Sequence, residues 1–181
     1  TQISLNSIIN NKFSITNLEI STKLIEIKSL ISFARAFKNN PELYITEKLI
    51  SKGYVIANGK FEFDANGQIR NNYQIDGIIK DTKIDLLKKY NIQNLNFKFN
   101  IENENFKFQE IKLQINNLPL LSDEILVNKA NKKFYINGSI GNKEIELDKK
   151  FINLFIKPIL PKLDIDKVKL NSLNKFSFIS N

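Results

Sequence analysis

The chain of 181 residues contains no cysteine, histidine, methionine or tryptophan. Without cysteine it can form no disulfide and no thiolate metal site, and it has no thiolate nucleophile. Without histidine it lacks the usual general base and the commonest transition-metal ligand. These absences exclude thiol chemistry, zinc sites built on cysteine or histidine, and histidine-dependent acid–base catalysis.

Long apolar runs are also absent. A membrane-spanning helix needs about 18 or more consecutive apolar residues, and the longest apolar stretch, from Phe151 to Leu163, is interrupted by Lys157, Pro158 and Pro161. The chain begins at Thr1 without an initiator methionine, so we expect residues 1–181 to be a single segment of a larger protein. A signal peptide or membrane anchor would then lie outside this segment.

Arginine is scarce, while isoleucine, asparagine and lysine dominate with 29, 26 and 25 residues. The formal net charge is +8. This positive net charge has two interpretations: the coding bias of an AT-rich genome, or an anionic partner such as nucleic acid or a lipid surface. Proteins that read base sequence rely on arginine for contacts with base edges. The scarcity of arginine therefore argues against sequence-specific nucleic-acid binding. Hydrophobic residues make up 42% of the chain, enough for a folded core.

Alternation with period two is the strongest structural signal. From Leu95 to Ile101 every odd position is apolar and every even position is polar, which predicts a half-buried strand. A polar loop follows at Glu102 to Asn105, and the alternation then resumes at Phe106. The phase shifts at Gln109-Glu110, which predicts a β-bulge there. Residues 95–115 are therefore predicted to form an antiparallel hairpin that pairs Ile101 with Phe106 and Phe99 with Phe108.

The same alternation recurs along the chain, so the predicted fold class is all-β and mainly antiparallel. Turn signals separate the alternating segments at Asn10-Asn11, Asn58-Gly59, Asn66-Gly67, Asn116-Asn117 and Gly141-Asn142. Helix is predicted in two places only. One is Ser32 to Lys52, with a possible start at Pro41, and the other is Lys149 to Lys157, ended by Pro158.

An internal repeat relates residues 73–90 to residues 134–151 without a gap. Both copies read aromatic, Ile, Asx-Gly, Ile, Asx, Ile, acid, Leu, Lys-Lys, aromatic. Chance similarity in an Ile/Lys/Asn-rich chain is the alternative to a duplicated unit. We predict two strand–turn–strand units with turns at Asp81-Thr82 and Asn142-Lys143. Gly77 and Gly138 are predicted to mark equivalent bends that curl the sheet.

Long alternating strands, Asx-Gly kinks and hairpins such as Phe97-Lys-Phe99 resemble the AsmA-like family of repeating β-groove proteins, over about residues 54–148. The resemblance implies a long curled sheet forming an open groove, in a periplasmic protein anchored to the inner membrane through its parent chain. It also implies a role in carrying phospholipids to the outer membrane, and hence in lipid transport and outer-membrane biogenesis.

The residues support a binding groove independently, because a single sheet leaves one apolar face without a second layer. Exposed apolar surfaces above several hundred Å² usually bind something. The predicted lining for phospholipid acyl chains is Ile75, Ile79, Leu95, Phe97, Phe99, Ile101, Phe106, Phe108, Ile111, Leu113, Ile136 and Ile140. The alternative is a closed barrel or sandwich with an ordinary core, in a structural or adhesive repeat domain of a surface protein.

Catalytic and cofactor signals are weak. The sequence contains no glycine-rich phosphate loop and no Gly-x-Ser-x-Gly elbow. The pairs Glu102/Glu104 and Asp164/Asp166 could supply oxygen ligands to calcium, but solvated loops are the favoured interpretation. Single-stranded nucleic-acid binding would require aromatic and lysine side chains on the same strand face, and in Leu95 to Ile101 they alternate. We therefore expect no enzyme, cofactor, metal or nucleic-acid partner.

Overall fold

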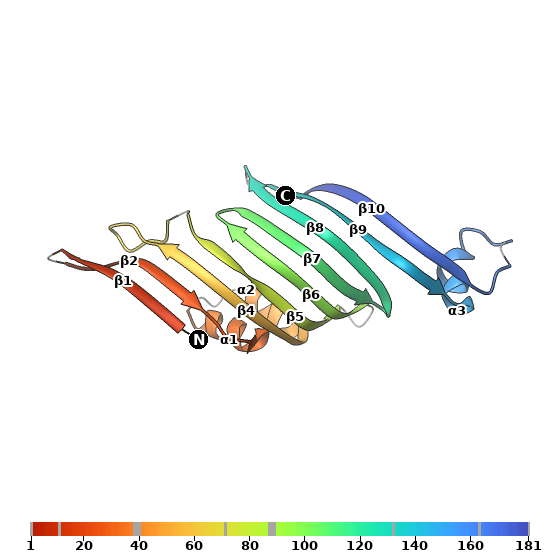
Figure 1. The fold of residues 1–181 in the computed structure, drawn as a ribbon, viewed down its shortest axis with the longest axis horizontal. Helices are drawn as coiled ribbons and strands as arrows, with labels where there is room; N and C mark the ends of the chain where they lie inside the picture. The colour runs from red at the N-terminus through yellow and green to blue at the C-terminus, as the bar shows by residue number, and fades with distance from the viewer. Residues whose placement is uncertain are drawn as a thin grey trace.

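In a computed structural model the chain forms one antiparallel sheet with short helical segments at two places along it (Figure 1). The structure describes residues 2–10, 12–37, 41–70, 72–86, 90–131, 133–162 and 164–180. The strands are β1 (Gln2–Asn10), β2 (Lys12–Ser21), β3 (Ile25–Glu26), β4 (Ile50–Glu62), β5 (Gln74–Leu86), β6 (Tyr90–Glu102), β7 (Asn105–Ile115), β8 (Leu118–Ala130), β9 (Lys133–Leu147) and β10 (Val168–Ser180). The helices are α1 (Ile27–Phe37), α2 (Pro41–Leu49) and α3 (Lys149–Phe151), the last continued by the π-helical turn η1 (Ile152–Ile156).

The sheet follows the order of the sequence. Its strands run β1-β2-β4-β5-β6-β7-β8-β9-β10, and the short β3 pairs with β4. Every pairing is antiparallel, and β1 and β10 form the two open edges. The predicted all-β, mainly antiparallel and open fold is confirmed. Within the described residues the sheet neither closes into a barrel nor stacks on a second sheet.

The predicted hairpin of residues 95–115 is also confirmed. Strands β6 and β7 turn at residues 103–104, and Asn103 has a left-handed φ of 56°. The register pairs Ile101 with Phe106 and Phe99 with Phe108. The bulge falls at Glu110, where φ is 53° and the register with β6 shifts.

The predicted turns inside the two repeat copies are wrong. In each copy one long strand, β5 or β9, continues through the expected reversal point. Asp81 and Glu144 instead have left-handed φ values of 48° and 49°, close to register shifts with β6 and β10 respectively. An extra residue absorbed in this way bends a strand without reversing it.

Two of the predicted turn signals also prove to lie inside strands. Asn58-Gly59 belongs to β4 and Gly141-Asn142 belongs to β9. A Cβ on Gly141 would lie 2.0 Å from the carbonyl oxygen of Ser172, so this glycine allows close strand contact. Turns do form at residues 65–66 and 116–117, while Asn11 lies outside the described residues.

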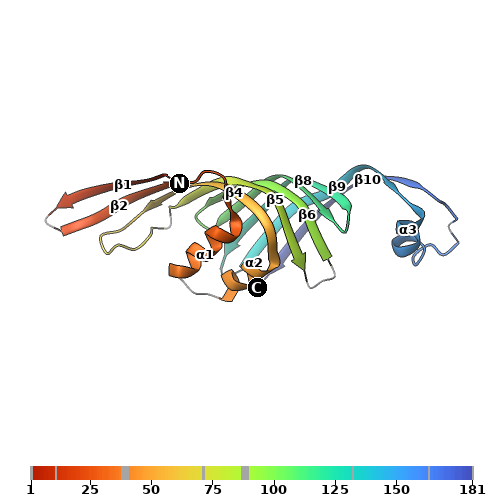
Figure 2. The same cartoon turned by 90° about the horizontal axis from the view of Figure 1, so that it is seen from below.

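Register shifts occur midway along most of the strand pairs from β4 to β10. Bulges of this kind increase local twist and curve a sheet. The sheet is accordingly curved, and α1 and α2 lie on its inner side under β4 and β5 (Figure 2). We call this inner side the concave face.

Two small hydrophobic clusters attach the helices to the sheet. Ile27 and Ile31 of α1 pack with Ile50 and Val55 of β4. At the other end, Ile152 of η1 is fully buried against Ile145 and Leu147 of β9.

Both predicted helical regions are helical, with changed bounds. Helix α1 begins at Ile27, earlier than predicted, and α2 begins at Pro41 as predicted. Residues 50–52, predicted to end the helical region, belong to β4. Their place in the strand follows from the sheet, because Ile50 pairs with Ile84 of β5.

Candidate functional site: an apolar concave face

Two continuous rows of side chains cross the concave face from β5 to β10. Direct cross-strand partners share one face of a sheet. The isoleucine row contains Ile75, Ile101, Phe106, Val127, Ile136 and Phe178. The glycine row contains Gly77, Phe99, Phe108, Ile125, Gly138 and Phe176. Every described side chain in these rows is apolar, and each glycine is paired with a phenylalanine on one neighbouring strand.

Aromatic rings meet along this face. Phe97 contacts Phe99 and Phe108 edge to face, with ring centroids 6.4 and 5.7 Å apart. At the β10 edge, the rings of Phe176 and Phe178 stack at 5.3 Å. These spacings are favourable for aromatic pairs, so the rings form a connected surface.

The predicted lining residues outside the two rows lie further along the same strands, toward the register shifts in the middle of the sheet. Ile79 pairs with Phe97, and Leu95 pairs with Thr82. Leu113 pairs with Leu120, and Ile111 pairs with Ser122. Ile140 follows Gly138 by two positions on β9, and alternation places it on the same face.

The predicted lining is not uniformly accessible. Ile79 and Phe99 pack against the cluster that α1 makes with β4, so the helices cover this end of the face. Ile111 is buried. Phe106, Phe108 and Ile136 are only half-buried and lie beyond the reach of both helical clusters.

Besides the two glycines, the predicted lining lacked four side chains of the rows: Ile125, Val127, Phe176 and Phe178. Each pair stands two positions apart in the sequence, so the alternation that identified the other members was also present here. Their place in the rows depends on the pairing of β8, β9 and β10, which no local pattern specifies.

The molecule exposes far more surface than a compact protein of its size. A folded monomer of 21.0 kDa is expected to expose about 9,000 Å², whereas this chain exposes 13342 Å². Within the described residues only eight hydrophobic side chains are buried, and they belong mainly to the two helical clusters. The centre of the concave face therefore has no sealed core over it.

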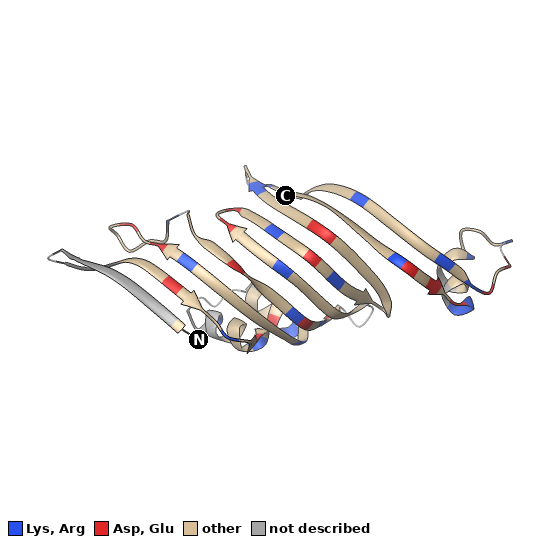
Figure 3. Cartoon of the chain, viewed as in Figure 1, with Lys and Arg blue, Asp and Glu red and all other residues tan. Residues whose placement is uncertain are grey.

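Residues of both charges lie on adjacent strands of the sheet (Figure 3). The side chains that alternate with the apolar rows are mostly polar or charged and belong to the opposite, convex face. Lys98 meets Glu110 at 2.6 Å, and Lys107 meets Glu124 at 2.9 Å. A third pair, Lys129 with Glu104 at 2.8 Å, lies instead at the end of the concave face, because Lys129 pairs with Phe134, two positions before Ile136 on β9. Exposed pairs of this kind stabilise little, but they neutralise lysines that would otherwise attract phosphates.

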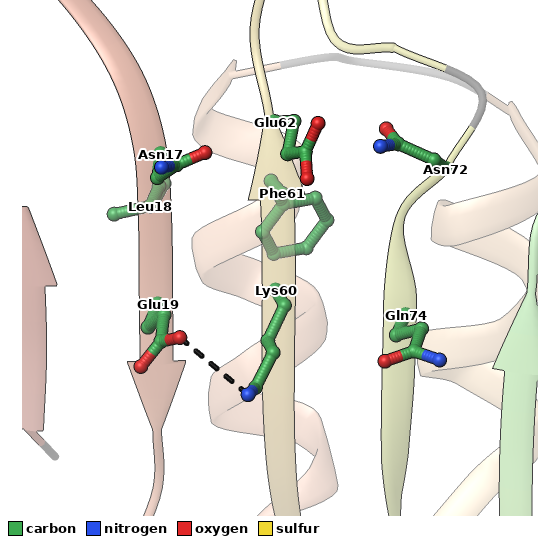
Figure 4. Close-up of a pocket in the computed structure, with 8 residues that line it drawn as sticks. All are labelled: Asn17, Leu18, Glu19, Lys60, Phe61, Glu62, Asn72 and Gln74. Carbon is green, nitrogen blue, oxygen red and sulfur yellow. Dashed lines mark ion pairs between the residues drawn. The ribbon is translucent and has the colours of Figure 1, made fainter. Parts of the chain in front are cut away.

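A hollow of about 220 Å³ lies across β2, β4 and β5, and most of its lining is polar. In Figure 4 the side chains of Glu19, Lys60 and Gln74 stand in line on these three strands, with an ion pair of 3.5 Å between Glu19 and Lys60. Its polar walls make it unsuitable for an acyl chain, which distinguishes it from the concave face.

No group of metal-ligating side chains assembles within the described ranges. The Asp166 carboxylate, considered above for calcium, instead pairs with Lys149 at 2.6 Å. The hydrogen bond from Lys149 lowers the pKa of Asp166, and the lysine's charge acts in the same direction. Glu104 is likewise engaged by Lys129.

Among the described residues, no helix has the length and apolarity needed to cross a membrane. Comparison of the chain with protein-family models, curated proteins and solved structures found no match.

Proposed function

We propose that this chain is a non-enzymatic lipid-binding module that holds phospholipid acyl chains along its concave face. The observation that carries the proposal is the pair of apolar rows, which continue across β5 to β10 on an open sheet. Covering a large apolar side chain contributes about 1.5–3 kcal/mol. Several uncovered phenylalanines and isoleucines therefore favour a ligand as apolar as an acyl chain.

The shape of the face suits this ligand class. Its rows run across the strands without a charged side chain, so an extended hydrocarbon could lie along them. The polar convex face would remain in solvent. Together with the resemblance to AsmA-like proteins, this arrangement supports a role in phospholipid transport between the inner and outer membranes, in a parent protein of the periplasm.

The test compares two single substitutions on neighbouring strands of the hairpin. Phe106→Asp places an unpaired carboxylate in the isoleucine row, where contact with hydrocarbon would be strongly unfavourable. Asn100→Asp adds the same charge to the polar side of β6, opposite Lys107. Native mass spectrometry of each purified protein measures co-purified phospholipid, and circular dichroism reports the β structure.

We expect phospholipid with the unchanged chain and with Asn100→Asp, and none with a folded Phe106→Asp. An unchanged chain without lipid, together with unfolding of Phe106→Asp, would reject the groove and favour a sealed structural or adhesive domain. Phe99→Asp is less informative, because Phe99 packs against the cluster under α1 and its loss would disturb folding in either case.

A further inference from the structure

The segment after η1 presents two aliphatic side chains to solvent at its tip. Residues 157–162 read Lys-Pro-Ile-Leu-Pro-Lys, and we call them the 157–162 tip. Ile159 is 77% exposed, more than any other large hydrophobic residue described, and Leu160 is 54% exposed. Nothing in the alternating strand pattern explains an Ile-Leu pair held outward between two prolines.

The backbone of the tip is adapted to an apolar environment. Pro158 and Pro161 have no N–H group. The N–H groups of Ile159 and Leu160 both donate to the carbonyl oxygen of Ile156, at 3.0 and 2.8 Å. An unsatisfied amide is costly to bury in hydrocarbon, and from residue 158 to residue 161 the tip has no free amide donor.

The charge around the tip is positive. Lys157 and Lys162 immediately flank the two prolines, and residues 148–169 contain six lysines and three aspartates, a net charge of +3. Aliphatic side chains surrounded by lysines are the usual composition of segments that bind anionic membrane surfaces.

The tip stands on a rigid base at one end of the molecule. Ile152 of η1 is fully buried against β9 and fixes the start of the segment. Both ribbon views place α3 and the loop that follows it at the end of the molecule beyond the sheet (Figures 1 and 2). A flat surface can therefore approach the tip without meeting the strands first.

We infer that the 157–162 tip docks this chain on the surface of an anionic lipid bilayer. Ile159 and Leu160 enter the boundary of the hydrocarbon, and Lys157 and Lys162 lie at the level of the lipid phosphates. A protein pocket could supply its own acceptors to backbone amides, whereas hydrocarbon cannot, so the internal satisfaction of these amides favours a bilayer. Docking goes beyond the binding of cargo by the concave face and does not depend on it.

The absence of tryptophan permits a clean fluorescence test on the complete chain. Ile159→Trp places a single reporter on the tip, and Ile69→Trp places a matched reporter at an isoleucine that is 53% exposed elsewhere. With vesicles of phosphatidylcholine and phosphatidylglycerol, we expect emission to move to shorter wavelength and to be quenched by brominated acyl chains at position 159 only. No shift at 159, or equal shifts at both positions, would overturn the inference.

Vesicle co-sedimentation supplies the second measurement. Replacing both aliphatic residues, as Ile159→Ser with Leu160→Ser, should weaken binding at least about tenfold. Neutralising the flanking charges, as Lys157→Gln with Lys162→Gln, should weaken it roughly 30-fold. Ile69→Ser should leave it unchanged.

Equal binding of the serine variant and the unchanged chain, or equal binding to pure phosphatidylcholine vesicles, would contradict docking. The serine variant should still co-purify with phospholipid if the concave face binds cargo. Failure of docking is thus distinguishable from failure of the groove.

Discussion

Glycines facing phenylalanine rings are a defining feature of the sheet at the level of single residues. Gly77 pairs with Phe99, and Gly138 pairs with Phe176 at the corresponding position of the second repeat copy. The sequence predicted that both glycines mark equivalent bends; they do occupy equivalent places in strands, but the left-handed residues of β5 and β9 are Asp81 and Glu144. The sequence did not indicate what approaches the glycines, because the rings come from other strands.

The two glycines differ in the space around them, so alanine should destabilise the protein more at one position than at the other. A Cβ on Gly77 would lie 2.2 Å from the carbonyl oxygen of Ile56 and 2.7 Å from the Phe99 ring, whereas the nearest atoms to a Cβ on Gly138 lie at 3.0 Å. We expect Gly77→Ala to lower the free energy of unfolding by about 2–3 kcal/mol and Gly138→Ala by less than about 1 kcal/mol. Urea denaturation measures both values, and equal losses would contradict this account.

A single carboxylate joins α2 to α1. Ser32 donates a hydrogen bond of 2.8 Å to Glu47, and Arg35 forms an ion pair with the same carboxylate. The hydrogen bond from Ser32, followed by that from Arg35, lowers the pKa of Glu47 below its ordinary value. Since the folded-state pKa is depressed, the contact stabilises the protein above the ordinary carboxyl pKa and is lost as pH falls through the folded-state value.

We therefore predict that acid weakens the α1–α2 contact and that Glu47→Gln removes this part of the pH dependence. Unfolding measured from neutral to acidic pH should show a smaller decline for Glu47→Gln than for the unchanged chain. Parallel curves for the two proteins would show that Glu47 does not contribute.

At the scale of elements, α1 and α2 cover one end of the concave face, and η1 packs against the end of β9. Pro41 begins α2 because its missing N–H and fixed φ suit the first helical turn. The start of α1 at Ile27 was missed because Ile27 and Ile31 are selected by contact with Ile50 and Val55 of β4. Local sequence showed a helix-forming region, and packing decided its bounds.

Ile152 and Ile159 provide a matched pair within one short segment. Ile152 is fully buried and holds η1 against β9, whereas Ile159 is exposed. We expect Ile152→Ala to cost about 2–5 kcal/mol of unfolding free energy and Ile159→Ala to cost less than about 0.5 kcal/mol.

Hydrogen exchange should also show faster exchange around residues 149–157 in Ile152→Ala. A stable Ile152→Ala with unchanged exchange would mean that η1 does not depend on this contact.

For the whole molecule, the open edge at β10 exposes large apolar side chains. Leu173, Phe178 and Ile179 of this strand are 66%, 58% and 64% exposed. An exposed strand edge with apolar side chains readily pairs with another strand. We predict concentration-dependent self-association, measured by light scattering after size-exclusion chromatography.

A charge on this edge should reduce the association. Ile179→Lys is expected to shift the chain toward the monomer, whereas Ile159→Lys, outside the sheet edge, should not. Unchanged association of Ile179→Lys would assign the contact to another surface.

Local sequence determined the one-sided strands, the β6–β7 register and the bulge at Glu110, because period-two alternation and a short polar loop leave few other pairings. It did not determine that β5 and β9 continue where turns were expected. That outcome depends on register with neighbouring strands and on left-handed residues such as Asp81. Tertiary structure alone decided that the sheet stays open, that α1 covers only one end of the apolar rows, and that Ile159 faces solvent. The cover over one end of the rows depends on contacts between residues far apart in the chain, such as Ile27 with Val55, and the outward position of Ile159 depends on how Ile152 packs against β9.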